Sequence, residues 1–75
     1  MECSERVVVD PAILVGKPVI RGTRISVEFI MELLANGWTE GQIFESYPQL
    51  SHEDILAALQ YTTSLLKEEP VYALP

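Results

Sequence analysis

Apolar residues recur at helical spacing through the C-terminal two thirds of the chain, in three stretches that each begin with the same local pattern. A Ser or Thr follows one apolar residue directly and precedes another by four places. Such a hydroxyl accepts hydrogen bonds from the free N–H groups of a first helical turn, while the flanking apolar pair packs across the helix start. The pattern occurs at Ser26, Thr39 and Ser51, and it predicts helices over about residues 27–36, 40–46 and 52–68.

Two extended segments precede these helices. The first is the β-branched run at residues 6–9, which ends at Asp10-Pro11, a pair that favours a turn. The second covers residues 18–25, and Gly22 in its middle predicts a bulge or a tight bend. Because two short strands are not stable alone in water, we expect them to pack on helices or to pair with a second copy of the chain.

The order of these elements predicts a mostly α fold, a three-helix bundle with a short N-terminal β segment of two strands. The short connection at residues 47–51 resembles the turn of a helix-turn-helix unit. A chain of 75 residues has room for one domain, so we predict a single domain over residues 1–75. Within it we place a β arm at 5–25, the bundle at 26–69 and an apolar tail at 70–75.

The apolar content is high for so small a protein. Hydrophobic residues make up 48% of the chain, whereas a domain of this size buries only about 60% of its unfolded surface. Since large exposed apolar patches are uncommon on soluble monomers, we expect a homodimer or a permanent partner. The first predicted helix is apolar nearly all round, and we place the partner or dimer interface at Phe29, Leu33 and Trp38.

Charge is distributed unevenly along the chain. The net charge is −6, from 11 acidic and 5 basic residues, which is opposite to the basic character of a free-standing nucleic-acid binder. Residues 1–27 carry 4 − 3 = +1, whereas residues 28–75 carry 1 − 8 = −7. No carboxylate lies between Pro11 and Val27, and Lys17, Arg21 and Arg24 all fall in that segment.

Residues suited to catalysis or metal binding are scarce. Cys3 and His52 are the single cysteine and the single histidine, so neither a Cys/His pair nor a multi-histidine metal site can be assembled. We therefore expect a protein that is not an enzyme and has no cofactor. The N-terminus lacks the features of a signal peptide, and no apolar stretch approaches the ~20 residues of a membrane-spanning helix, which predicts a cytoplasmic location.

The candidate binding residues are Lys17, Arg21, Thr23 and Arg24. Guanidinium groups offer paired donors for phosphate or carboxylate, and Gly22 permits close backbone approach. This favours an anionic partner; the alternative is that the arginines pair with acids of the first helix or cap the third. The third helix begins with Ser51-His52-Glu53-Asp54, whose carboxylates repel phosphate, so DNA contact is expected from the cationic segment instead.

One long motif resembles a known protein family. Its parts are Asp10-Pro11, Gly16-Lys17-Pro18-Val19-Ile20-Arg21-Gly22-Thr23-Arg24-Ile25-Ser26-Val27, Ala35-Asn36-Gly37-Trp38-Thr39, Tyr47-Pro48 and Leu50-Ser51 with Asp54-Ile55. The pattern is similar to the bacterial "domain of unknown function 433" proteins, over about residues 5–63. The resemblance implies a homeodomain-like helix-turn-helix fold without catalytic residues.

The same resemblance implies an antitoxin that neutralises a PIN-like ribonuclease toxin. The anions met by the cationic segment are then either phosphates of the promoter DNA or the metal-binding carboxylates of the nuclease, and the sequence does not choose between them. A second reading is a structural or transcription-associated interaction module without a toxin partner.

Overall fold

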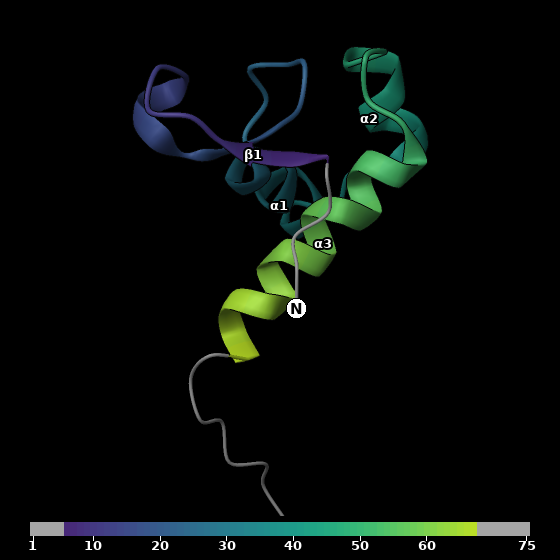
Figure 1. Cartoon of the computed structure of the whole chain (residues 1–75). Helices are drawn as coiled ribbons and strands as arrows, with labels where there is room; N and C mark the ends of the chain where they lie inside the picture. Colours follow the sequence, from purple (N-terminus) through teal and green to yellow (C-terminus); the bar gives the residue numbers. More distant parts are fainter. Residues whose placement is uncertain (1–5, 68–75) are drawn as a thin grey trace, which may run out of the picture.

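The computed structural model describes residues 6–67 and shows a short β-hairpin set on three helices (Figure 1). The elements in chain order are β1 (Val7–Val9), the 3-10 turn η1 (Leu14–Gly16), β2 (Pro18–Ile20), α1 (Val27–Ala35), α2 (Glu40–Ser46) and α3 (His52–Lys67). This arrangement confirms the mostly α fold with a small N-terminal sheet. The tail predicted at residues 70–75 and Cys3 lie outside the described residues.

Each helix begins directly after the hydroxyl residue that the sequence pattern indicated. Ser26 Oγ accepts from the backbone N–H of Phe29 at 2.9 Å, and Thr39 forms a reciprocal capping box with Gln42. At the start of α3, Ser51 Oγ accepts from the N–H of Asp54 at 3.3 Å, and Asp54 Oδ2 accepts from the N–H of Ser51 at 3.0 Å. These bonds satisfy N–H groups that have no partner within the helix, which explains why the helix starts were predictable.

The two strands pair with each other in antiparallel register, with Val7 opposite Ile20 and Val9 opposite Pro18. The sequence predicted one extended segment over 18–25, but β2 ends at Ile20 and the chain turns before Ser26, which forms an isolated bridge with Val19. Gly22, at φ +82°, provides the bend that its position predicted. The hairpin therefore folds back on itself and leads directly into α1.

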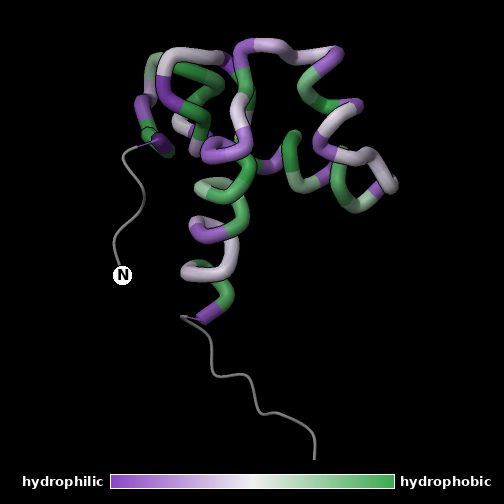
Figure 2. The backbone as a smooth tube through the Cα atoms, turned by 90° about the vertical axis from the view of Figure 1, so that its right-hand side faces the viewer, coloured by the Kyte–Doolittle hydropathy of each residue, from purple (hydrophilic) through white to green (hydrophobic). Residues whose placement is uncertain are grey.

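The core lies where the hairpin meets α1, α2 and α3. Its most buried side chains are Val19, Ile20, Ile30, Ile43 and Ile55. The hydropathy colouring in Figure 2 shows apolar segments gathered around this junction, while the C-terminal turns of α3 extend beyond it. Within residues 6–67, no helix combines the length and apolar character needed to span a bilayer.

Candidate functional site

A four-residue turn, Arg21–Arg24, occupies the centre of the cationic segment. It is closed by a hydrogen bond from the backbone N–H of Ile20 to the carbonyl of Ile25 at 2.9 Å. Both flanking isoleucines are buried, Ile20 at 1% and Ile25 at 9% exposure, so the core fixes the two ends of the turn. The turn thus carries an arginine at each end of a firmly anchored loop.

Thr23 holds the shape of this turn. Its hydroxyl donates to the carbonyl of Ile20 at 2.8 Å and accepts from the N–H of Ile25 at 3.0 Å. Its backbone N–H also donates to Ile20, at 3.0 Å. The hydroxyl of Thr23, which the sequence suggested as a ligand contact, is therefore engaged inside the turn, and it positions the neighbouring arginines.

Arg21 and Arg24 are both exposed. The backbone N–H of Arg21 donates to the carbonyl of Arg6 at 2.6 Å, which extends the hairpin pairing by one residue, and Arg21 takes part in a further interaction. Among residues 6–67, Arg24 makes no side-chain hydrogen bond or ion pair. Its planar fork of donors is therefore available to an anion.

Lys17 lies at the opposite end of β2 from the turn. Its Nζ is 3.0 Å from Glu28 Oε1 on α1, and both side chains are more than half exposed. Such a pair contributes little stability in water and is readily exchanged for another anion. At about 3.3 Å per residue, the strand separates the Cα atoms of Lys17 and Arg21 by about 13 Å. The fold thus brings the two arginines together and leaves Lys17 apart.

A strained apolar loop lies next to Lys17, and the sequence reasoning missed it. Leu14 and Val15 have positive φ angles of 50° and 58°, a conformation that is unfavourable for a branched side chain. Val15 is 94% exposed, and Leu14 is 37% exposed. Strain and exposure at one place point to a role in binding rather than in packing. The available signal was the apolar run at residues 13–15 between Pro11 and Gly16.

The start of α3 is fixed by an ion pair between residues far apart in the chain. Arg6 Nη1 donates to Asp54 Oδ1 at 3.1 Å, with the Asp54 side chain only 9% exposed. Asp54 is thereby removed from the surface that a DNA recognition helix would present. The sequence did not indicate this partner for Arg6, because 48 residues separate the two.

His52 and Glu40 join α3 to α2. The Nδ1–H of the His52 ring donates to Glu40 Oε1 at 2.8 Å. This hydrogen bond and the charge of Glu40 raise the pKa of His52 above its ordinary value of 6.5, and Glu53 adds to the shift. Neighbouring carboxylates therefore balance the His52 ring in its protonated form, and they keep this end of α3 unattractive to phosphate.

The three residues proposed as a partner interface lie on or near the core. Leu33 is buried at 7% exposure, while Phe29 and Trp38 are half-buried against the core cluster. The ring of Phe29 meets that of Tyr47 edge-on, with centroids 5.5 Å apart. Contact of these residues with a partner stays a prediction, and only the outer sides of Phe29 and Trp38 are accessible for it.

Groups of acidic, histidine or cysteine side chains that could hold a metal ion do not occur among residues 6–67. Glu28, which shares a helix face with Glu32, is paired with Lys17. The groups that this site presents are guanidinium side chains, which suit anions, beside an exposed apolar loop.

A hairpin with an arginine-bearing turn, set on three helices, defines a small, mostly α-helical protein with a candidate anion-contacting site. The chain belongs to the family described as "Protein of unknown function (DUF433)", whose model matches residues 7–62. This confirms the family resemblance inferred from the motif that runs from Asp10 to Ile55. No curated protein matches the chain.

A solved structure supports the fold. The chain is similar to a DUF433 member protein from Anabaena variabilis ATCC 29413, with 27% sequence identity and a TM-score of 0.77. The similarity covers 84% of this chain and 62% of that chain, so this protein spans less than two thirds of the length of its structural relative.

Proposed function

We propose that the protein is a non-enzymatic, antitoxin-like protein of the cytoplasm that binds and neutralises a PIN-like ribonuclease. The single observation that carries the proposal is the turn Arg21–Arg24, which presents Arg24 without an ion pair among the described residues on a loop anchored by buried isoleucines. The antitoxin role is what the family resemblance implies. The geometry of the turn supports the part of this proposal that requires binding of an anionic partner.

Carboxylates of the nuclease are the ligand class that this turn fits best. A metal-dependent ribonuclease holds its cation with clustered Asp and Glu side chains, and a guanidinium fork can form paired hydrogen bonds with them. Insertion of Arg24 among them would displace the cation and stop cleavage. Because the backbone of the turn is already shaped by Thr23, little backbone freedom is lost when the arginine binds.

The loop at Leu14 and Val15 favours a protein partner over DNA. Val15 is 94% exposed and apolar, so it gains from an apolar pocket on a protein, whereas the DNA backbone offers a lattice of phosphates. The overall charge of −6 also opposes approach to DNA. We therefore propose that the ribonuclease contacts the loop and the turn together. Promoter binding through the same arginines is proposed as a second activity.

The test compares two variants that change the net charge equally. Arg24→Gln removes one positive charge from the turn, and Gln49→Glu adds one negative charge at an exposed position in the α2–α3 connection. Inhibition of a PIN-like ribonuclease from the same host and binding to DNA upstream of this gene are measured for both variants. We expect Arg24→Gln to weaken inhibition at least about tenfold, the effect of losing one charged hydrogen-bond pair, while Gln49→Glu leaves it unchanged.

Other outcomes separate the alternatives. Loss of DNA binding with full ribonuclease inhibition in Arg24→Gln would assign the turn to DNA. Equal inhibition by both variants and the wild type would contradict a role for the turn. A further variant, Val15→Asn, tests the loop: it should weaken the ribonuclease complex and leave DNA binding intact. Purification from the native host without any nuclease-sized partner would favour the interaction module that lacks a toxin.

A further inference from the structure

The outer face of α3 carries an apolar stripe that the core does not use. Leu56, Leu59, Thr63 and Leu66 follow one another at intervals of three, four and three residues, the spacing at which side chains of one helix meet a second helix. Leu56 is 41%, Leu59 40% and Leu66 64% exposed. We call these four residues the outer stripe.

The outer stripe lies opposite the face that packs on the core. Successive residues of a helix are rotated by about 100°, so the buried Ala58 points away from Leu56 by about 160°. In both Figure 1 and Figure 2 the C-terminal turns of α3 project beyond the hairpin, α1 and α2. Within the described part of the chain, this end of α3 therefore has an accessible apolar side along several turns.

The one polar member of the outer stripe is already satisfied. Thr63 Oγ1 donates to the backbone carbonyl of Leu59 at 2.8 Å, so its hydroxyl needs no partner from outside the helix. The cost of burying an unpaired hydroxyl is thus avoided, and the Thr63 methyl group can pack against a neighbour. All four members of the stripe are compatible with a dry helix–helix contact.

We propose that the outer stripe binds a second copy of this chain, with the two α3 helices side by side and antiparallel. In that register Leu56 packs near Leu66 of the partner subunit, and Leu59 packs near Thr63 of the partner subunit. The stripe is self-complementary because its two halves face each other across a two-fold axis. The high apolar content of this small chain supports a partner of this kind.

Charges beside the stripe select the antiparallel arrangement. Glu53 and Lys67 lie on the same edge of α3, 14 residues or two heptads apart. Antiparallel pairing brings Glu53 close to Lys67 of the partner subunit twice, once at each end of the contact. Parallel pairing would instead bring like charges together. The opposed helix dipoles of the antiparallel pair also favour it.

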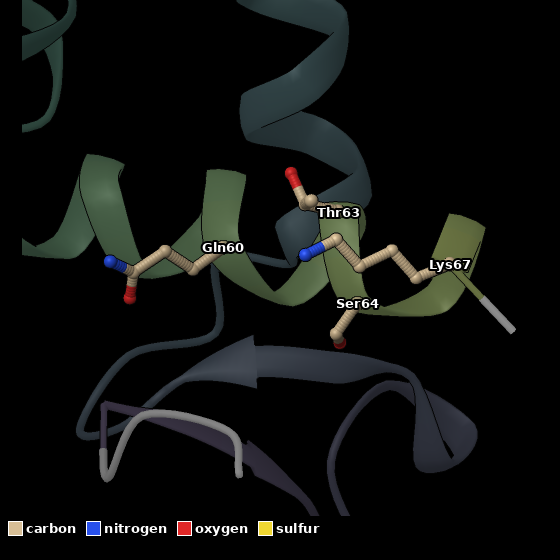
Figure 3. A pocket seen from close by; sticks show the side chains of 4 residues that line it. All are labelled: Gln60, Thr63, Ser64 and Lys67. Atoms are coloured by element: carbon tan, nitrogen blue, oxygen red, sulfur yellow. The ribbon is translucent and has the colours of Figure 1, made fainter. Parts of the chain in front are cut away.

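A hollow along the same edge can receive side chains of the partner helix. It has a volume of about 340 Å³ and is lined by Gln60, Thr63, Ser64 and Lys67. Figure 3 shows the Lys67 side chain lying back along the helix toward Thr63. Among residues 6–67, Lys67 forms no ion pair, so its charge is available to Glu53 of the partner subunit.

The first test measures the mass of the full chain in solution by sedimentation. We expect twice the mass of the 8.4 kDa chain at micromolar concentration. The double variant Leu56→Gln/Leu59→Gln should raise the dimer dissociation constant by roughly tenfold or more, because two apolar contacts are lost. Val9→Gln is the matched control, since it removes another exposed apolar side chain, 56% accessible, away from α3. Circular dichroism confirms that each variant keeps its helices.

The second test determines the orientation of the helices. In a Cys3→Ser background, Glu53→Cys and Lys67→Cys are prepared separately and then mixed under mild oxidation. Antiparallel α3 helices give a mixed disulfide between the two variants and little cross-linking of either variant alone. Cross-linking of each variant to itself would indicate a parallel pair and overturn the proposed register.

Two further results would overturn the proposal. One is a monomeric full chain at micromolar concentration; if removal of residues 68–75 then produced a dimer, the stripe would be covered by that segment of the same chain. The other is a dimer that persists unchanged in Leu56→Gln/Leu59→Gln, which would place the contact elsewhere, with Phe29 and Trp38 as the next candidates.

Discussion

Replacement of Asp54 by alanine tests whether one carboxylate connects the hairpin to the start of α3. Its Oδ1 accepts from Arg6 at 3.1 Å and its Oδ2 from the N–H of Ser51 at 3.0 Å. Loss of the capping contact costs about 1 kcal/mol of unfolding free energy. Loss of the Arg6 pair costs a further ~0.5–1 kcal/mol, because half of the arginine side chain is exposed and water replaces part of the interaction.

The expected total for Asp54→Ala is about 1.5–2 kcal/mol, and the melting temperature should fall by about 6–16 °C, at about 4–8 °C per kcal/mol for a domain of this size. Urea denaturation followed by the fluorescence of Trp38, the single tryptophan, measures the change. Arg6→Gln should cost about 0.5–1 kcal/mol, and the double variant should cost less than the sum of the two because they share one contact.

Two results would refute this reasoning. If Asp54→Ala changed the unfolding free energy by less than about 0.5 kcal/mol, neither the cap nor the ion pair would contribute as the geometry indicates. If Arg6→Gln were as destabilising as Asp54→Ala, the cap would be unimportant and the ion pair would carry the whole effect. The variant Asp54→Asn serves as a control, since an amide oxygen can still accept from the N–H of Ser51.

Three more predictions follow from the described contacts. Titration of His52 by NMR should give a pKa above 6.5 that falls toward this value in Glu40→Gln. Because the pKa is raised in the folded protein, the His52–Glu40 pair stabilises the fold fully below pH 6.5, the unfolded value, and this stabilisation disappears as the pH rises through the folded pKa. A stability difference between wild type and Glu40→Gln that stays constant over this pH range would contradict the prediction. Val15→Asn should stabilise the fold by about 0.5–1 kcal/mol in thermal unfolding, since Asn tolerates positive φ better than a branched side chain, and a destabilised variant would show that Val15 packs against the fold. Ile43→Ala should cost about 2–5 kcal/mol in urea denaturation because this side chain is fully buried, whereas a cost below that of Ile43→Val would speak against its position in the core.

The helices could be predicted from the sequence because their starts depend on neighbouring residues. Ser26, Thr39 and Ser51 accept from N–H groups three positions further along the chain, so the signal and the bond lie in the same short segment. The bend at Gly22 was predictable for the same reason, because only a few residues permit its positive φ. The cationic segment that contains Arg21 and Arg24 could be predicted from the distribution of charged residues along the sequence alone.

The remaining features depend on contacts that a local pattern does not contain. The pairing of Arg6 with Asp54 requires the hairpin to lie beside α3, and that arrangement is a result of the whole core. The strain at Leu14 and Val15 is likewise set by the closure of the hairpin, because neither residue favours positive φ by itself. The outer stripe of α3 could not be predicted from the sequence, because the residue type leucine does not indicate whether a side chain faces the core or the outside.

Ser26 joins the cationic turn to α1 without a linker. Its backbone bridges to Val19 of β2, and its side chain caps α1, so the turn and the helix share a single rigid junction. A partner that binds Arg24 would thus contact a preorganised surface, so the association would lose little free energy to the ordering of a loop. In amide hydrogen exchange, the N–H groups of Thr23 and Ile25 should accordingly show the same opening free energy as the helical core, rather than the lower value of an independent loop.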